Sequence, residues 1–153
     1  MLFRSDRGNT QNFNIPSAEQ LHKLHAPYFK RMDDHIRDLN QKIGKQAVFV
    51  VPAGQAVIAL REKVIAGKVP GIQQQSDLFK DSLGHGKAPL QTLVVYCNYA
   101  VAYRRCPVGL PMQLSLMRDY NNPELNRMLQ EIAWDAVTHH PMSGVVPQSA
   151  ASK

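Results

Sequence analysis

One short apolar run, QAVFVVP at residues 46–52, constrains the fold more than any other stretch of this sequence. Its β-branched residues lie between turn signals at Gly44 and Pro52, a pattern typical of a buried strand. A strand by itself leaves its backbone donors and acceptors without partners, which is costly away from water. This segment therefore needs neighbouring strands from the N-terminal residues, from another subunit or from sequence outside the chain.

The other periodic segments predict helices. Ser17, with Gln20 three residues later, indicates a helix start of the capping-box type. Apolar residues then recur every three or four positions as far as Ile43, and Gly44 marks the end of the helix. Pro27 is expected to kink this helix or to start a second one. Further helices are expected over 53–66, 88–105 and 122–138.

The order of strand, helix, loop and helix predicts an α/β fold that is rich in helix and has one clear strand. It resembles the end of an α/β sheet protein more than a complete one. We expect a flexible arm over residues 1–16, a single α/β domain over 17–141 and a disordered tail over 142–153. We also expect the unpaired strand to make the chain a homo-oligomer, with a dimer that joins two sheets or buries apolar helix faces as the expected form.

The charge of the chain raises the question of nucleic acid. The formal net charge is +6 and the isoelectric point is near 9.5. The basic residues are nevertheless scattered, without a dense run or a known nucleic-acid-binding motif. We therefore expect a solvated basic surface and no sequence-specific nucleic-acid partner.

The cysteines and the hydropathy indicate a compartment. Cys97 and Cys106, placed on one helix, are separated by about 13 Å of helical rise, which is too far for a disulfide. Two free thiols suit a reducing environment. The sequence shows neither a signal peptide nor an apolar stretch long enough to span a membrane. We expect a soluble, cytoplasmic chain without a membrane partner.

The stretch DSLGH at residues 81–85 carries side chains suited to acid–base chemistry. A carboxylate from Asp81 on one nitrogen of His85 would fix the imidazole tautomer and leave the other nitrogen free to accept a proton. Gly84 and Gly86 would let the backbone place the ring at a rim. The same residues also fit a polar turn, in which Asp81 and Ser82 form the turn and His85 is solvated.

Residues 79–85, FKDSLGH, and 89–110, PLQTLVVYCNYAVAYRRCPVGL, resemble the C-terminal portion of SGNH/GDSL-type hydrolases. In that family an acid and a histidine precede a final helix with a similar ending. The resemblance spans about residues 17–111 and implies a partial flavodoxin-like α/β/α unit that hydrolyses carboxylic esters. It implies His85 as general base, Asp81 as its orienting acid and a small-molecule ester as substrate. No cofactor is expected.

The nucleophile of such a hydrolase is not assigned by the sequence. The run KDSL at 80–83 makes Ser82 a candidate, because it spells three letters of the family's nucleophile block. No Gly-Asp-Ser block lies upstream, so we expect either the C-terminal part of a longer hydrolase or a site assembled by self-association. The competing hypothesis is a non-catalytic helical interaction or scaffold protein, built from helices over 17–43, 89–105 and 122–138.

The remaining histidines predict no metal site. His22, His25 and His35 lie on one helix, but no further ligand is evident, so they are interpreted as a solvated face. His139 and His140 fall at a helix end, where a protonated imidazole is favoured by the helix dipole.

Overall fold

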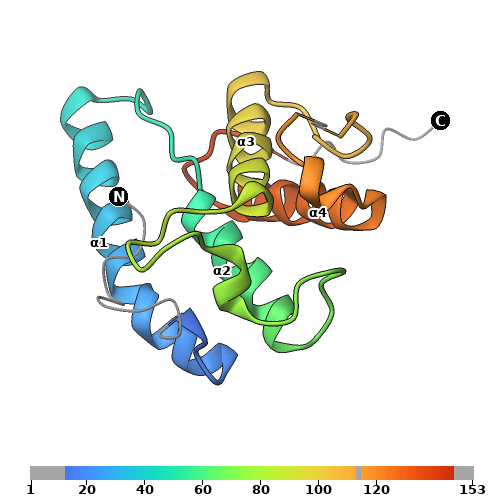
Figure 1. Ribbon diagram of the computed structural model, residues 1–153. Helices are drawn as coiled ribbons and strands as arrows, with labels where there is room; N and C mark the ends of the chain where they lie inside the picture. Colours follow the sequence, from blue (N-terminus) through green and yellow to red (C-terminus); the bar gives the residue numbers. More distant parts are fainter. Residues whose placement is uncertain (1–12, 113–114, 147–153) are drawn as a thin grey trace.

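The computed structural model describes residues 13–112 and 115–146, and it is helical (Figure 1). The bounds follow the predicted ranges closely, and Ser17, Gly44 and Asn122 cap helix ends where the sequence indicated them. The elements in chain order are α1 (Ala18–Ile43), α2 (Ala53–Ile65), the short 3-10 helix η2 (Gln75–Leu78), α3 (Ala88–Tyr103), the 3-10 helix η3 (Arg118–Tyr120) and α4 (Pro123–His139).

Helices α2, α3 and α4 pack against one another and enclose the hydrophobic core. Leu60 of α2, Leu93 of α3 and Leu129 of α4 are all completely buried. Burying a side chain of this size contributes about 1.5–3 kcal/mol. The hydroxyl of Tyr96 donates a hydrogen bond of 2.7 Å to Oδ1 of Asn126, which satisfies the polar end of this buried ring. The predicted helix over 88–105 is confirmed for 88–103. It is buried on one side only, since Val95 is 45% and Tyr103 68% exposed.

Helix α1 lies to one side of this core, and its main helix contact is with α2 (Figure 1). Its predicted ends are confirmed: Ser17 Oγ accepts a hydrogen bond from the Gln20 amide, and Gly44 adopts a left-handed conformation with φ of 76°. The helix continues through Pro27 as one element. Of the two outcomes expected at this proline, a kink or a second helix start, the second is therefore wrong.

The apolar stripe of α1 is present, but the described residues cover little of it. Only Leu21 and His25 of this helix are buried. Four large apolar side chains along the same helix are 40–52% exposed: Leu24, Tyr28, Met32 and Ile43. The part of α1 beyond its contact with α2 thus presents a hydrophobic surface to solvent.

The predicted α/β fold is wrong. Residues 46–52 have no regular secondary structure and no β-strand forms within the described ranges, so there is no flavodoxin-like α/β/α unit and no SGNH-type sheet. The amides of Ala47 and Val48 donate instead to the side-chain oxygen of Asn40, at 2.9 Å each, and the Val50 amide donates to the Met142 carbonyl at 2.9 Å. A side chain and a loop thus bind groups that neighbouring strands would bind in a sheet.

The expected arm and tail are only partly described, because residues 1–12 and 147–153 lie outside the described ranges. Of the remainder, Phe13 is buried and stacks on Phe79 with 4.0 Å between ring centroids. Met142, Ser143 and Val145 are also buried. In the described part of the chain, no helix has the length and apolar character needed to cross a membrane.

The contact between α1 and α2 can be tested at Gly54. A Cβ atom at this position would lie 2.6 Å from Cε1 of Phe29, so Gly54→Ala must push the aromatic ring away from α2. We expect this change to lower the free energy of unfolding by about 1 kcal/mol in urea titrations.

The control is the same substitution in a Phe29→Leu background, where the ring is absent. There the higher helix propensity of alanine, worth about 1 kcal/mol over glycine, should make Gly54→Ala neutral or stabilising. An equal effect in both backgrounds would contradict the proposed contact.

Candidate functional site

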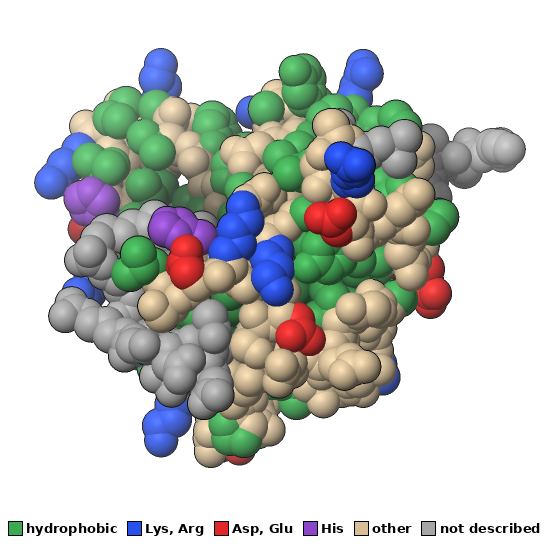
Figure 2. Space-filling model, viewed as in Figure 1, with side chains coloured by type: hydrophobic (Ala, Val, Ile, Leu, Met, Phe, Trp, Pro, Cys, Tyr) green, Lys and Arg blue, Asp and Glu red, His purple; other side chains and the backbone are tan. Residues whose placement is uncertain are grey.

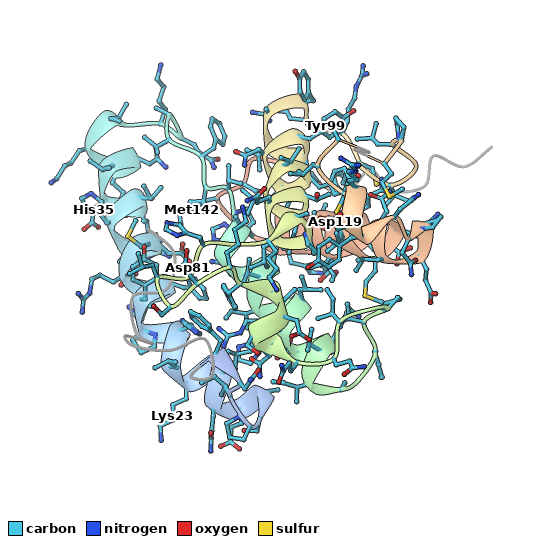
Figure 3. The ribbon with its side chains drawn as sticks, in the orientation of Figure 1. Lys23, His35, Asp81, Tyr99, Asp119 and Met142 are labelled. Atoms are coloured by element: carbon cyan, nitrogen blue, oxygen red, sulfur yellow. The ribbon has the colours of Figure 1, made fainter. Side chains whose placement is uncertain are left out.

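The loop between η2 and α3 is closed by backbone hydrogen bonds around Asp81, which Figure 3 labels on the loop ahead of α3. The Lys80 amide donates to the His85 carbonyl at 2.7 Å, and the Lys87 amide donates to the Leu78 carbonyl at 2.8 Å. Phe79 and Gly86 form an isolated antiparallel bridge across the loop. The two ends of the segment are thereby held side by side, which limits the positions open to the residues between them.

The carboxylate of Asp81 organises this loop. Its Oδ2 atom accepts a hydrogen bond of 2.6 Å from Nδ1 of His85, and its Oδ1 atom accepts from the Leu83 and His85 amides at 3.0 and 3.3 Å. The hydrogen bond from the His85 side chain is the main cause that lowers the pKa of Asp81 below its usual value. Because a carboxylate only accepts, Nδ1 carries the proton and Nε2 of a neutral ring is left as an acceptor.

The glycines on either side of His85 have separate steric roles. Gly84 has a φ of 87°, in the left-handed region that side chains disfavour. Gly86 lies so close to α3 that an added Cβ would meet Cβ of Leu90 at 2.8 Å. The side-chain amide of Gln91 donates to the Gly86 carbonyl at 2.8 Å. These contacts fix the loop that contains His85 (residues 79–87, the histidine loop) against the first turn of α3.

An apolar hollow of about 300 Å³ lies beside this loop. Carbon-rich side chains from α2, α3 and the loop form most of its wall, and the exposed fraction of the His85 side chain is 67%. A pocket with apolar walls and a few polar groups is typical of small-molecule sites, and the polar side chain in this lining is that of Gln91, whereas Asp81 and His85 are not among the lining residues. The lining residues are Val57, Phe79, Gly84, Gly86, Leu90, Gln91 and Val94.

The structure brings together two of the three residues predicted for catalysis. Asp81 and His85 form the expected pair. Ser82 is exposed on the same loop, and no hydrogen bond joins its hydroxyl to the imidazole in the described part of the chain. The geometry therefore does not link the candidate nucleophile to the candidate base.

The histidines of α1 serve other contacts. The His22 ring is hydrogen-bonded to the carboxylate of Glu62 of α2, and His25 is buried beside Arg61. The described ranges contain no group of three or more histidine, cysteine or acidic side chains that could hold a metal ion. His139 at the end of α4 lies 3.1 Å from Oδ1 of Asp135, and its side chain is exposed.

Sequence reasoning missed the buried guanidinium of Arg61. Its Nε atom donates to Oε1 of Gln75 at 2.9 Å, and Nη2 donates to the Phe13 carbonyl at 2.8 Å. The Arg61 Cζ atom also lies 5.8 Å from the centre of the Phe79 ring, within cation–π range. The available signal was an arginine on the apolar face of α2, directly after the buried Leu60.

Compared with known proteins, the chain matches no family model, no curated protein and no solved structure. The resemblance of residues 79–110 to part of a hydrolase family stays a prediction.

The burial of His25 generates a prediction about pH. Burial is the main cause that lowers its pKa from 6.5 to about 4, and the nearby Arg61 and His22 lower it further. The unfolded chain therefore binds a proton in this range while the folded chain does not, so stability falls as the pH drops from 6.5 towards 4. We expect His25 to account for a loss of about 1–3 kcal/mol across that window.

The measurement is urea unfolding of the wild type and of His25→Gln at several pH values. The difference in unfolding free energy between the two proteins should change between pH 6.5 and 4 and level off below. The exposed His139→Gln serves as the control. A wild type and a His25→Gln variant with parallel pH profiles would contradict a neutral, buried His25.

Proposed function

We propose that this protein hydrolyses carboxylic esters, with His85 as general base and Asp81 as the residue that orients it. The observation that carries the proposal is the 2.6 Å hydrogen bond between Asp81 and His85 Nδ1, on a loop whose Gly84 and Gly86 line an apolar hollow. A tautomer fixed in this way leaves Nε2 available to take a proton from an attacking group.

Water is the nucleophile that fits this arrangement. It attacks the ester carbonyl carbon while Nε2 of His85 accepts one of its protons. The tetrahedral intermediate then breaks its carbon–oxygen bond to the alcohol, and the imidazolium returns the proton to the departing oxygen. Asp81 stays ionised and stabilises the imidazolium, a role that its lowered pKa supports. Attack by Ser82 is disfavoured because its hydroxyl does not contact the base.

The hollow favours an uncharged acyl group as the part of the substrate that binds. Val57, Leu90 and Val94 offer it apolar contacts, and the volume of about 300 Å³ suits a short chain. None of the described residues that line the hollow is charged. Figure 2 shows histidine, acidic and basic side chains near the middle of the viewed face. Short-chain esters with a neutral acyl part are therefore the first substrates to test.

The test is hydrolysis of p-nitrophenyl butyrate by the full chain. A positioned general base contributes about 10²–10⁴-fold, so His85→Gln should reduce kcat/KM by roughly that factor. Asp81→Asn should reduce it less, because the imidazole remains but its orientation is lost. Ser82→Ala should retain the wild-type rate, since water attacks directly.

The chain offers a matched control for the general base. His139 is also exposed and also faces an aspartate four residues earlier, but the apolar hollow is not beside it. His139→Gln should therefore hydrolyse the ester at the wild-type rate. Equal rates for the wild type, His85→Gln and His139→Gln would exclude His85 as the base, and a purified wild type no faster than buffer would exclude the function itself.

A second candidate function is that of a non-catalytic interaction protein. It is favoured by the large apolar side chains that α1 leaves exposed, since a contiguous surface of this kind is typical of a binding site. Such a protein shows no ester hydrolysis above background, which distinguishes it from the first candidate in the same assay.

A further inference from the structure

A second concave surface, a groove of about 490 Å³, lies where the residues after α4 meet the end of α3 and the segment after α1. Figure 1 shows the segment after α4 passing between the connection from α1 to α2 and helix α3. The groove shares none of its lining residues with the hollow beside the histidine loop. It is therefore a separate candidate site.

The side chain of Arg104 is held in one orientation at this groove. Its Nη1 atom donates a hydrogen bond of 2.7 Å to the Gly144 carbonyl, and its Cζ atom lies 5.2 Å from the centre of the Phe49 ring, within cation–π range. The same ring packs against the backbone of Gly144, where an added Cβ would overlap it. A guanidinium that is already oriented loses less conformational freedom when it binds a ligand.

Most of the donors of this guanidinium remain available. An arginine has five N–H groups, and the Gly144 carbonyl takes one of them. Within the described ranges, Nε and Nη2 of Arg104 have no acceptor. These two nitrogens form one edge of the planar fork, whose parallel N–H groups match the two oxygens of a carboxylate. Arg104 is exposed, so a ligand can reach this edge from solvent.

The backbone of Arg104 also points to a use for its side chain. With a φ of 54°, it is the one residue other than glycine with a positive φ in the part of the chain that the structure describes. It caps the C-terminal end of α3, a position where glycine adopts this conformation with less strain. Residues in disfavoured conformations cluster at ligand sites, where the side chain repays the strain.

The other walls of the groove determine which anion fits. Phe49, Pro141 and Val145 supply apolar surface, and none of the described lining residues is acidic. The buried His140 also lines the groove, but its ring nitrogens face protein groups: Nδ1 accepts from the Met142 amide at 3.2 Å, and Nε2 lies 3.3 Å from Oδ1 of Asp33. Arg104 is therefore the group that a ligand would bind.

We propose that this groove binds a small organic monocarboxylate, with its two oxygens on Nε and Nη2 of Arg104 and its hydrocarbon part against Phe49 and Val145. One guanidinium balances one negative charge, so a monoanion fits better than a phosphate dianion. The apolar walls favour an acid that carries a hydrocarbon chain. This proposal does not depend on the chemistry of Asp81 and His85.

The test is a titration of the full chain with hexanoate, followed by the amide resonances in two-dimensional NMR. We expect a Kd of about 1 mM, with the shifts centred on Gly144 and Val145. Hexanamide has the same hydrocarbon chain without the charge, and should bind at least about tenfold more weakly. This comparison needs no variant, so it does not depend on how a substitution affects folding.

Substitutions of Arg104 test the fork itself. Arg104→Gln should weaken hexanoate binding about tenfold or more, and Arg104→Lys should weaken it severalfold, because an ammonium does not bind two oxygens side by side. The matched control is Arg105→Gln, which removes an exposed neighbouring arginine that does not line the groove and should bind as the wild type does. Circular dichroism checks that each variant keeps its helix content.

Several results would overturn the proposal. They are the absence of shifts with hexanoate, equal affinities for hexanoate and hexanamide, and shifts centred on the hollow beside the histidine loop. A folded Arg104→Gln with wild-type affinity would exclude Arg104 as the binding group. Tighter binding of inorganic phosphate than of hexanoate would exclude a carboxylate as the preferred ligand.

Discussion

The buried guanidinium of Arg61 is the interaction on which the arrangement of the other segments depends. A buried cation costs several kcal/mol unless its donors are satisfied, so the groups around it must be in place for the fold to be stable. Those groups come from separate parts of the chain: the Phe13 carbonyl before α1, the Gln75 side chain of η2 and the ring of Phe79. One side chain of α2 thus holds the N-terminal segment and the beginning of the histidine loop against the core.

The candidate site depends on this arrangement through Phe79. The ring that lies beside Arg61 and stacks on Phe13 also lines the apolar hollow, and its backbone pairs with Gly86 across the loop. The orientation of the imidazole depends on a local contact, because the carboxylate that binds it, Asp81, lies four residues earlier in the same loop. The hollow that Gly84 and Gly86 of this loop line depends on long-range contacts, because its other walls come from the packing of α2 and α3.

Whether a feature of the fold or the candidate site could be predicted from the sequence depends on how far apart in the chain its interacting residues lie. Ser17 and Gly44 at the ends of α1, and Asn122 with Pro123 at the start of α4, act within a few residues, so the sequence indicates them directly. The pairing of Asp81 with His85 is similarly local. The strand at 46–52 was predicted from composition, but a strand exists only with its neighbours, and Asn40 and Met142 take their place here. The roles of Arg61 and Phe79 depend on contacts between distant segments, which periodicity does not reveal.

The Met142 carbonyl has a consequence for the segment that joins α1 to α2. It accepts hydrogen bonds from both the Val50 amide and the Gln46 side chain, so the residues after α4 are bound to the residues after α1. A chain cut before Met142 would leave both donors without this acceptor. Because Asn40 of α1 binds the same segment, the residues after α4 also help to hold α1 in place.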